Sequence, residues 1–300
     1  MIYGLLLFGL TDIARLLVRL FRMRGRFRAF LARCYARGLT VFLLSALLTG
    51  LAMVNTQIFV VKPYDIAVDG RGSGLDGLNV VMVSDLHLGA TMGYRGLARM
   101  VDRINALEPD VVCLCGDIFD EATPDSLKEA ASAAFSRIES RYGSYFVIGN
   151  HDYGHGDEGI AEATLDYFRR ANVRVLSDEA VTVEDGFIIA GRTDSTGIFR
   201  NEKRKSVSDI LEGKQEKLPV ILLDHKPGDV EEAARAGVSL QLSGHTHSGQ
   251  VLPVAFLIDA VFPISYGEGK FEDMYAVVSS GLGAWGFPLR LGSRSEIVQV

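Results

Sequence analysis

The sequence predicts a layered α/β domain over residues 62–300. Short β-branched runs, such as residues 80–83 and 111–114, alternate with longer stretches of helical periodicity, such as residues 97–107. This alternation is typical of sheets covered by helices. The chain has 300 residues, 48% of them hydrophobic and 23% charged, a composition that favours a folded domain over a disordered one.

The other elements follow from the same periodicities. A second helix is expected over residues 126–142, and the polar stretch 199–217, which contains Lys203-Arg204-Lys205, is expected to be a solvated loop with a short helix. Further strands are predicted at residues 145–148, 187–190, 220–223, 239–242, 275–278 and 296–300. No internal repeat is found.

Residues 1–61 are predicted to anchor the chain in a membrane. The segment from Gly38 to Val61 carries no charge, and its length is roughly that of a helix crossing the hydrocarbon core, so we expect a transmembrane helix over residues 38–61. A secretory signal peptide is disfavoured because about forty residues precede the segment and no Ala-x-Ala-like cleavage site follows it. A buried core helix is the other alternative.

Residues 1–37 form an amphipathic or partial span in this interpretation. Arg15, Arg19, Arg22 and Arg26 are spaced four, three and four residues apart, so they share one helical face that would lie toward anionic lipid headgroups. The alternative is a surface helix packed on the following domain. The abrupt hydrophobic start is also compatible with upstream spans that this chain lacks.

Charge separates the N-terminal region from the rest of the chain. Residues 1–40 hold eight arginines and one acid, a net charge of +7, and the remaining residues carry −13. An acidic body argues against nucleic-acid binding. Because basic loops stay in the cytoplasm, the arginines between Arg22 and Arg37 predict that residues 62–300 lie outside it.

Three cysteines, Cys34, Cys113 and Cys115, cannot form a disulfide framework. Cys113 and Cys115 lie two residues apart in an apolar run, so on a strand their side chains share one face. We interpret them as small buried side chains, with a redox or metal role as the alternative.

Polar, metal-capable side chains follow the apolar strands at five places, and open α/β sheets place their ligands at such strand ends. Five of the six histidines fall in these segments, and only His155 lies outside them. The segments are Asp85-Leu-His87, Gly116-Asp117-Ile-Phe-Asp120, Gly149-Asn150-His151-Asp152, Asp224-His225 and Gly244-His245-Thr-His247. Gly116, Gly149 and Gly244 are expected at sharp turns that bring the backbone close to the site.

Taken in this order, the segments resemble the calcineurin-like metallophosphoesterase superfamily at every motif position. The resemblance covers residues 79–300 and extends to Ser279-Ser280-Gly281-Leu282-Gly283 and Pro288-Leu289-Arg290, which are similar to a membrane-associated or exported bacterial branch of phosphohydrolases. Ser248 replaces a glycine common in that branch, without touching a ligand position. The resemblance implies a four-layer α/β/β/α sandwich with the five loops converging between the sheets.

The resemblance also implies two divalent metal ions that share Asp117. One ion would be held by Asp85, His87, Asp117 and His247, and the other by Asp117, Asn150, His225 and His245. Mixed oxygen and imidazole ligands suit manganese, which we expect first, or zinc, iron, cobalt or nickel, rather than calcium. The ions would activate a bound water to cleave a phosphoester or pyrophosphate bond.

The catalytic residues implied by the resemblance are His151 and Asp152. His151 would contact the phosphate and protonate the leaving oxygen, and Asp152 would orient His151 as a hydrogen-bond acceptor. Asp120 is expected to brace its loop. The expected substrate is a phosphorylated small molecule or a lipid-linked phosphodiester or pyrophosphate of the cell envelope, close to the bacterial cell membrane.

Two other functions remain open. One is a metal-binding scaffold without turnover, and the other is a phosphoprotein phosphatase, whose additional substrate-binding arginine motifs are not evident. The natural substrate, the metal and the oligomeric state are left open by the sequence.

Overall fold

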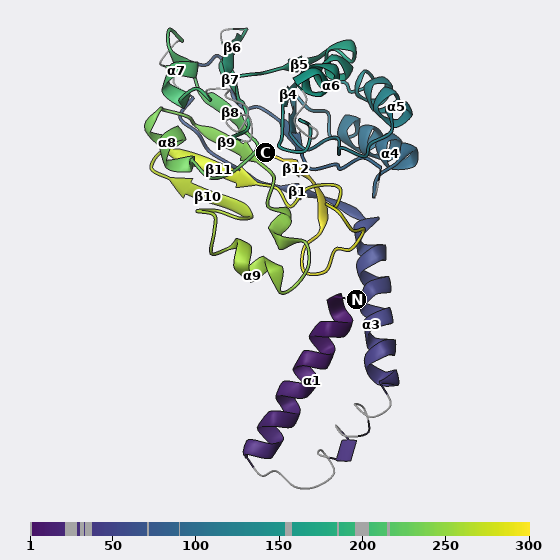
Figure 1. Cartoon of the computed structure of the whole chain (residues 1–300). Coiled ribbons are helices and arrows are strands. Elements are labelled where there is room, and N and C mark those ends of the chain that lie inside the picture. The colour runs from purple at the N-terminus through teal and green to yellow at the C-terminus, as the bar shows by residue number, and fades with distance from the viewer. Residues whose placement is uncertain are drawn as a thin grey trace. The chain divides into compact units, whose positions relative to one another are not determined.

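The structure is a computed structural model, and its chain divides into two compact units, Met1–Asn55 and Thr56–Val300. It describes residues 2–21, 29–30, 33, 38–70, 72–89, 91–153, 158–184, 186–195, 204–214 and 217–300. Cys34, His155, Arg22 and Arg26, for which the sequence made predictions, lie outside the described residues. Figure 1 gives the element labels used below, and each unit is described by itself.

Among the described residues of the N-terminal unit, the helices with defined bounds are α1 (Ile2–Leu20) and α3 (Leu39–Thr56, whose last residue belongs to the second unit). Large apolar side chains on both helices are exposed: Leu5, Phe8, Leu10, Ile13, Leu16, Leu17 and Leu20 on α1, and Phe42, Leu43, Leu44, Leu47, Leu51, Met53 and Val54 on α3. By length and hydropathy, no helix in the described part of the chain qualifies to cross a membrane. The predicted membrane helix over 38–61 is therefore not confirmed.

The predicted boundary of that segment is also corrected. Helix α3 ends at Thr56, and Phe59–Pro63 form strand β1, which pairs in parallel with β12 (Ser295–Gln299). The β-branched residues Val60 and Val61 gain backbone hydrogen bonds and neighbours in the sheet, which the end of an isolated helix would not offer. Residues 59–61 are thus part of the second unit.

The second unit is built on two six-stranded sheets. The first has the spatial order β1, β12, β2 (Val80–Val83), β3 (Val111–Cys115), β4 (Ser144–Val147) and β5 (Val173–Val175), and only the β12–β2 pair is antiparallel. The second has the order β10 (Gly267–Phe271), β11 (Met274–Val278), β9 (Leu240–Ser243), β8 (Val220–Asp224), β7 (Phe187–Arg192) and β6 (Glu179–Val183). Its central strands are parallel, and the β10–β11 and β6–β7 pairs at its edges are antiparallel.

Three hydrophobic clusters define the layers. The cluster between the sheets includes Met82, Cys113 and Leu223. Helices α4 (Tyr94–Asn105), α5 (Asp125–Phe135) and α6 (Glu158–Arg170) cover the outer face of the first sheet, and α7 (Val207–Leu211) and α8 (Val230–Arg235) cover that of the second. The predicted α/β/β/α order of layers is therefore found in this unit.

Buried strands explain why the central elements were predictable. Every residue of β2, β3 and β8 is buried, as expected for parallel strands covered on both faces, whose sequences are continuous apolar runs. Cys113 and Cys115 are fully buried and free, which confirms their interpretation as small core residues. Burial also raises the pKa of both thiols above the ordinary value.

Two predicted elements differ from the structure. The helix predicted over 126–142 ends at Phe135, because the Asn105 side chain donates to the carbonyl of Arg137 and accepts from the amide of Glu139, which fixes a turn there. The predicted loop over 199–217 contains α7, but its residues 199–203 and 215–216 lie outside the described part.

Candidate metal centre

The five predicted loops converge where strands end. Asp85 and His87 follow β2, Asp117 follows β3, and Asn150 with His151 follows β4. From the second sheet, His225 follows β8, whereas His245 and His247 follow β9. The structure brings all seven predicted metal ligands and His151 to this edge, and most of them form two groups.

The first group consists of Asp85, His87 and His247, whose ligand atoms all lie within 4.8 Å of one another. The Nε2 atoms of His87 and His247 are 3.1 Å apart, and Nε2 of His247 is 3.5 Å from Oδ1 of Asp85. Two neutral imidazole nitrogens with facing lone pairs would repel each other, so this approach requires a proton or a cation between them. The three side chains are buried.

The second group consists of Asp117, His225 and His245. Nε2 of His225 lies 3.1 Å from Oδ2 of Asp117, and the same carboxylate oxygen is 4.0 Å from Nε2 of His87 in the first group. Asp117 therefore contacts both groups, as the predicted bridging ligand should. Asn150 contributes a buried Oδ1 that has no hydrogen-bond partner among the described residues.

Further contacts orient the imidazoles. Nδ1 of His225 donates to the carbonyl of Cys115 at 2.8 Å, and Nδ1 of His87 lies 2.7 Å from Oδ1 of Asp120. Each contact leaves Nε2 to face the site, which is how metal-binding histidines are commonly held. Asp120, predicted only to brace its loop, thus also orients His87.

Neighbouring charges and burial shift the pKa values of the site residues in opposite directions. Burial disfavours the imidazolium of His225, but the Asp117 carboxylate raises the pKa of His225 to about 10. Burial, assisted by the positive charge of His225, lowers the pKa of His245 to about 3. Burial and the neighbouring His87 likewise lower the pKa of His247, while His225 and His87 together hold the pKa of Asp117 below its ordinary value in spite of burial.

The site residues therefore fit divalent metal ions. An unpartnered amide oxygen, two opposed imidazole nitrogens and a carboxylate between two groups would be satisfied together by cations, which bind the neutral form of histidine. Four histidines with carboxylate and amide oxygens are a donor set for transition metals.

The backbone at the site is strained. Asp85, His87, Asp117, His245 and His247 have φ angles of 53°, 43°, 54°, 71° and 51°. This left-handed region is uncommon for residues other than glycine, although Asp and His are enriched among the exceptions. Such strain persists only where the surrounding packing enforces it, and it gathers at functional sites.

Close packing against glycines helps to enforce this backbone. A Cβ atom at Gly149 would overlap Oδ1 and the amide of Asp117, and one at Gly244 would overlap Oδ2 of Asp85. One at Gly116 would lie 2.6 Å from Nδ1 of His225. The predicted close approach of the backbone at these three glycines is confirmed.

His151 lies at the edge of the two groups with a side chain that is 20% exposed. Its ring is edge-on to that of His87, with centroids 5.1 Å apart. Nδ1 of His151 is 3.5 Å from Oε1 of Glu121 and 3.7 Å from Oδ1 of Asp120. A partly exposed imidazole beside the centre is suitably placed to exchange a proton with a bound substrate.

The predicted role of Asp152 as an acceptor for His151 is wrong. Its carboxylate is buried and accepts hydrogen bonds from the backbone amides of Asp117, Ile118, Phe119 and Gly149. These contacts fix the loops after β3 and β4 to each other. The sequence could not reveal this, because the partners are backbone groups that any residue could supply.

Arg290 is a site residue to which the sequence assigned no role. It is fully buried, donates to the carbonyls of Ser280 and Gly283, and places Nη2 3.5 Å from Nδ1 of His247. It therefore secures the loop behind a predicted ligand. The run Pro288-Leu289-Arg290 was the available signal.

Asp224, one of the metal-capable residues of the strand-end segments, contacts arginines instead. Its Oδ2 forms ion pairs with Arg204 and, at 3.6 Å, with Arg192. Both arginine side chains are 6% exposed. Arg204 lies in the stretch predicted to be solvated, and that prediction is wrong at this position because Asp224 draws the guanidinium inward.

Comparison with known proteins identifies the family of the chain. Residues 78–249 match the family model for calcineurin-like phosphoesterases. A Danio rerio protein named transmembrane protein with metallophosphoesterase domain is 33% identical over 313 residues, covering 100% of this chain and 70% of the relative. Uncharacterized metallophosphoesterases of Aquifex aeolicus and Helicobacter pylori are both 31% identical, covering 86% and 73% of this chain and 97% and 58% of their own lengths.

The fold has two sheets, and two adjoining groups of carboxylates and imidazoles lie at the ends of its strands. This combination defines the class of protein as a metal-dependent hydrolase. The chain belongs to the calcineurin-like phosphoesterase family. It spans only 58% of the Helicobacter pylori relative, so the activity of a whole protein is a separate question.

Proposed function

We propose that the chain is a dinuclear metal-dependent phosphohydrolase that cleaves a phosphoester or pyrophosphate bond of a substrate at a membrane surface. The observation that carries the proposal is the pair of ligand groups joined by Asp117, with His151 beside them. One ion would be held by Asp85, His87, His247 and Asp117, and the other by Asp117, Asn150, His225 and His245. Bound ions would supply a water of lowered pKa and positive charge for the phosphoryl oxygens.

The protein's own residues do the rest. Asp120 and the carbonyl of Cys115 hold two imidazoles so that Nε2 faces the site. Asp152 and Arg290 lock the loops, so little reorganisation is needed when a substrate binds. His151 holds a proton at its ring and delivers it to the leaving oxygen.

Exposed apolar side chains next to the site support a membrane-borne substrate. Trp285 exchanges two hydrogen bonds with the Gln250 side chain, and its ring centroid lies 5.9 Å from that of His151. We call the exposed set Leu252, Phe256, Leu257, Val261, Trp285 and Phe287, which includes part of α9 (Val254–Ile258), the apolar rim. Aromatic and leucine side chains of this kind favour the interface of a bilayer.

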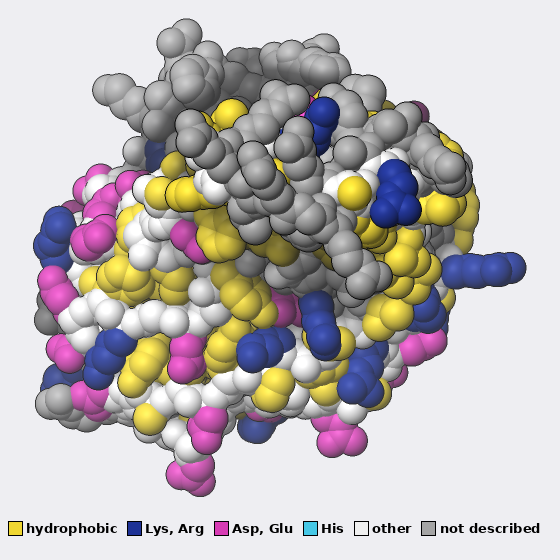
Figure 2. Space-filling model, turned by 90° about the horizontal axis from the view of Figure 1, so that it is seen from below, with side chains coloured by type: hydrophobic (Ala, Val, Ile, Leu, Met, Phe, Trp, Pro, Cys, Tyr) yellow, Lys and Arg dark blue, Asp and Glu magenta, His cyan; other side chains and the backbone are white. Residues whose placement is uncertain are grey.

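The N-terminal unit gives further support. Its exposed apolar side chains would be costly in water but stable in lipid, and the name of the Danio rerio relative includes the word transmembrane. Figure 2 shows hydrophobic side chains on the described surface, with lysines, arginines, aspartates and glutamates among them. Basic residues beside apolar ones suit the anionic surface of a membrane.

The hydrolase proposal is tested with the full chain in detergent. Hydrolysis of bis-p-nitrophenyl phosphate and p-nitrophenyl phosphate is measured after chelation and after adding back manganese, zinc, cobalt or nickel. We expect added metal to restore turnover. Asp117→Asn should reduce turnover by more than about a thousandfold, because it removes the ligand shared by both ions, whereas loss of a single transition-state contact costs about 10²–10³-fold. Asp102→Asn, at an exposed ion pair with Arg137, is the matched control.

Either of two results would overturn the proposal: turnover that survives complete chelation, or equal loss in Asp117→Asn and Asp102→Asn. Relative turnover of the two probes ranks diester against monoester cleavage.

The position of residues 62–300 outside the cytoplasm is part of the same proposal. Protease added to intact cells should cleave this region if it is exposed there. Full protection in spheroplasts, with cleavage only after lysis, would place it on the cytoplasmic side.

A further inference from the structure

A cavity lies beside the metal centre and contains none of the predicted metal ligands. It has a volume of about 840 Å³, within the range of small-molecule sites. Its lining includes Phe59, Met92, Arg95, Arg99, Leu282 and Gly283. All of these residues belong to the second unit.

The charge of this cavity is opposite to that of the chain around it. The residues after position 40 carry a net charge of −13, yet the lining has two arginines and no acid. Within the described part of the chain, neither Arg95 nor Arg99 forms an ion pair with a carboxylate. Unpaired guanidinium groups that converge on one cavity are suited to a phosphate, which they can bind through two parallel hydrogen bonds.

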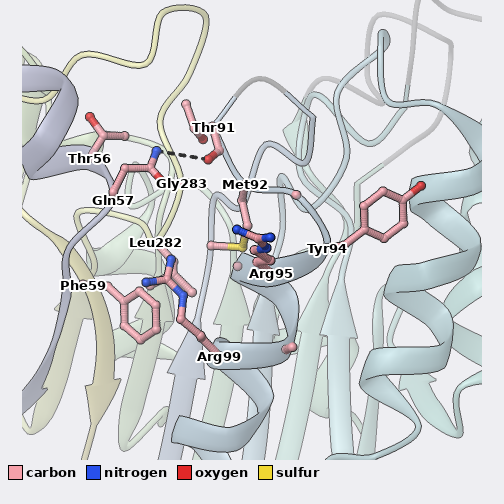
Figure 3. Close-up of a pocket in the computed structure, with 13 residues that line it drawn as sticks. Thr56, Gln57, Phe59, Thr91, Met92, Tyr94, Arg95, Arg99, Leu282 and Gly283 are labelled. Carbon is pink, nitrogen blue, oxygen red and sulfur yellow. Dashed lines mark hydrogen bonds between the residues drawn. The ribbon is translucent and has the colours of Figure 1, made fainter.

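The rest of the lining combines the polar side chains of Thr56, Gln57 and Thr91 with an apolar part. Met92 and Leu282 are buried, and the guanidinium carbon of Arg99 lies 5.6 Å from the ring centroid of Phe59. Figure 3 shows Phe59, Arg99 and Leu282 side by side at one end of the cavity and Tyr94 pointing away from it. A free inorganic anion would leave this apolar surface in contact with water, whereas the hydrocarbon of an amphiphile would cover it.

Hydrogen bonds connect residues that line the cavity to the loop of a predicted metal ligand. The amide of Gly283 donates to the carbonyl of Asp85 at 2.8 Å, and the amide of Ala284 donates to the hydroxyl of Thr91 at 3.1 Å. The loop that closes one side of the cavity thus contacts a predicted metal ligand through its backbone. Thr56 also ends helix α3, so the cavity begins where the apolar N-terminal sequence stops.

We propose that this cavity binds the phosphate headgroup of an anionic lipid, with Arg95 and Arg99 on the phosphate and Phe59, Met92 and Leu282 against the first part of the hydrocarbon. The site is separate from the metal centre, and its occupation does not depend on hydrolysis. It would hold one lipid of the bilayer beside the catalytic loops.

The test uses the full chain carrying Asp117→Asn in phosphatidylcholine nanodiscs, so that turnover does not enter. The discs contain a trace of phosphatidic acid with a photoreactive diazirine near the glycerol, and labelled peptides are mapped by mass spectrometry. We expect labels on the peptides that contain Phe59, Met92 or Leu282. Arg95→Gln with Arg99→Gln should reduce this labelling about tenfold, the equivalent of one charge-assisted contact.

Arg103→Gln is the matched control, because Arg103 is an exposed residue of the same helix outside the cavity. Its labelling should equal that of the parent. Circular dichroism of all variants separates loss of binding from loss of folding, and a folded double variant with unchanged labelling would overturn the proposal.

Two further experiments distinguish a lipid phosphate from a soluble phosphate as the ligand of the cavity. Diazirine diacylglycerol, which lacks the phosphate, should label these peptides weakly, and equal labelling would mean that the cavity recognises only hydrocarbon. Soluble glycerol 3-phosphate should not displace the lipid. Displacement at millimolar concentration would make the cavity a site for soluble phosphates and would overturn the assignment to a lipid.

Discussion

The metal centre and the N-terminal unit both depart from the usual rule that polar side chains are exposed and apolar side chains are buried. The metal centre buries polar side chains, and the N-terminal unit exposes apolar ones. At the centre, charged and polar residues such as Asp85, His87 and His225 are fully buried. In the N-terminal unit, Leu5, Leu20 and other large apolar residues are more than half exposed. Buried charge and exposed apolar surface are both costly in isolation, so each region is completed by a partner, cations in one case and lipid in our proposal for the other.

The two regions differ in how firmly they are fixed before the partner binds. Loops at the centre are held by Asp152, Arg290 and close contacts with glycines. Apart from the backbone of its own helix and its two chain neighbours, no atom lies within 4 Å of where the Cβ of Gly9 in α1 would be. A preformed centre favours catalysis, whereas an apolar helix needs only an apolar environment.

Outside the predicted metal ligands, the largest effect should come from His151, which tests whether the centre catalyses a reaction as well as binding metal. His151→Ala should reduce turnover by roughly 10²–10⁴-fold for a substrate with a poor leaving group, because a proton donor is lost. With p-nitrophenol, a good leaving group, the loss should be far smaller. Equal losses for an alkyl ester and a p-nitrophenyl ester would contradict the assignment of His151 as the acid.

Replacing one glycine by alanine in each region tests how closely that region is packed, through the change in the free energy of unfolding. Gly149→Ala should destabilise the chelated chain by about 3 kcal/mol, because the new methyl group overlaps Asp117 and the packing cannot yield. Gly9→Ala in α1 should be neutral or stabilising by about 1 kcal/mol, as in an exposed helix interior. Urea unfolding measures both, and equal effects would mean that the loops are not fixed by packing.

Trp285 reports directly on the apolar rim, since it is the only tryptophan of the chain. In nanodiscs containing lipids with a doxyl quencher near the headgroup, its fluorescence should be quenched, and aqueous acrylamide should quench it less than in detergent. A chain with Trp285→Phe and Val68→Trp, which moves the reporter to another exposed position, should show no quenching by lipid. Identical behaviour of the two reporters would argue against contact of the rim with the bilayer.

The smallest effect concerns the core between the sheets. In a Cys34→Ser chain, Cys113 and Cys115 should not react with a thiol reagent in the native state, because both are buried and their thiol pKa values are raised. Two thiols should react after unfolding in urea. Rapid labelling of the folded chain would mean that the layers separate readily.

Particular residues show what the sequence could predict. Strands β2 and β3 were predictable because continuous apolar runs are required where both faces of a strand are covered. The ligand groups were predicted because the polar segments that follow such runs resemble the motifs of a known family. These signals lie within a few neighbouring residues.

What escaped prediction depends on residues far apart in the sequence. Strand β5 has three residues, and β10 contains the half-exposed sequence Gly-Glu-Gly-Lys-Phe, so neither has an apolar run and each forms only through pairing with a neighbour. The role of Asp152 depends on amides 33–35 residues away. Helix α3 stops at Thr56 because the following valines pair with β12, at the other end of the chain.

The central claim is that two ions share Asp117, and the most direct test is the number of metal ions bound per chain. Full-length wild type, Asp117→Asn, His151→Ala and Asp102→Asn are loaded with manganese or zinc, freed of excess metal, and measured by elemental analysis. We expect two ions in the wild type, His151→Ala and Asp102→Asn chains, and none retained in Asp117→Asn. Two ions retained by Asp117→Asn, or equal loss in Asp117→Asn and His151→Ala, would contradict the account.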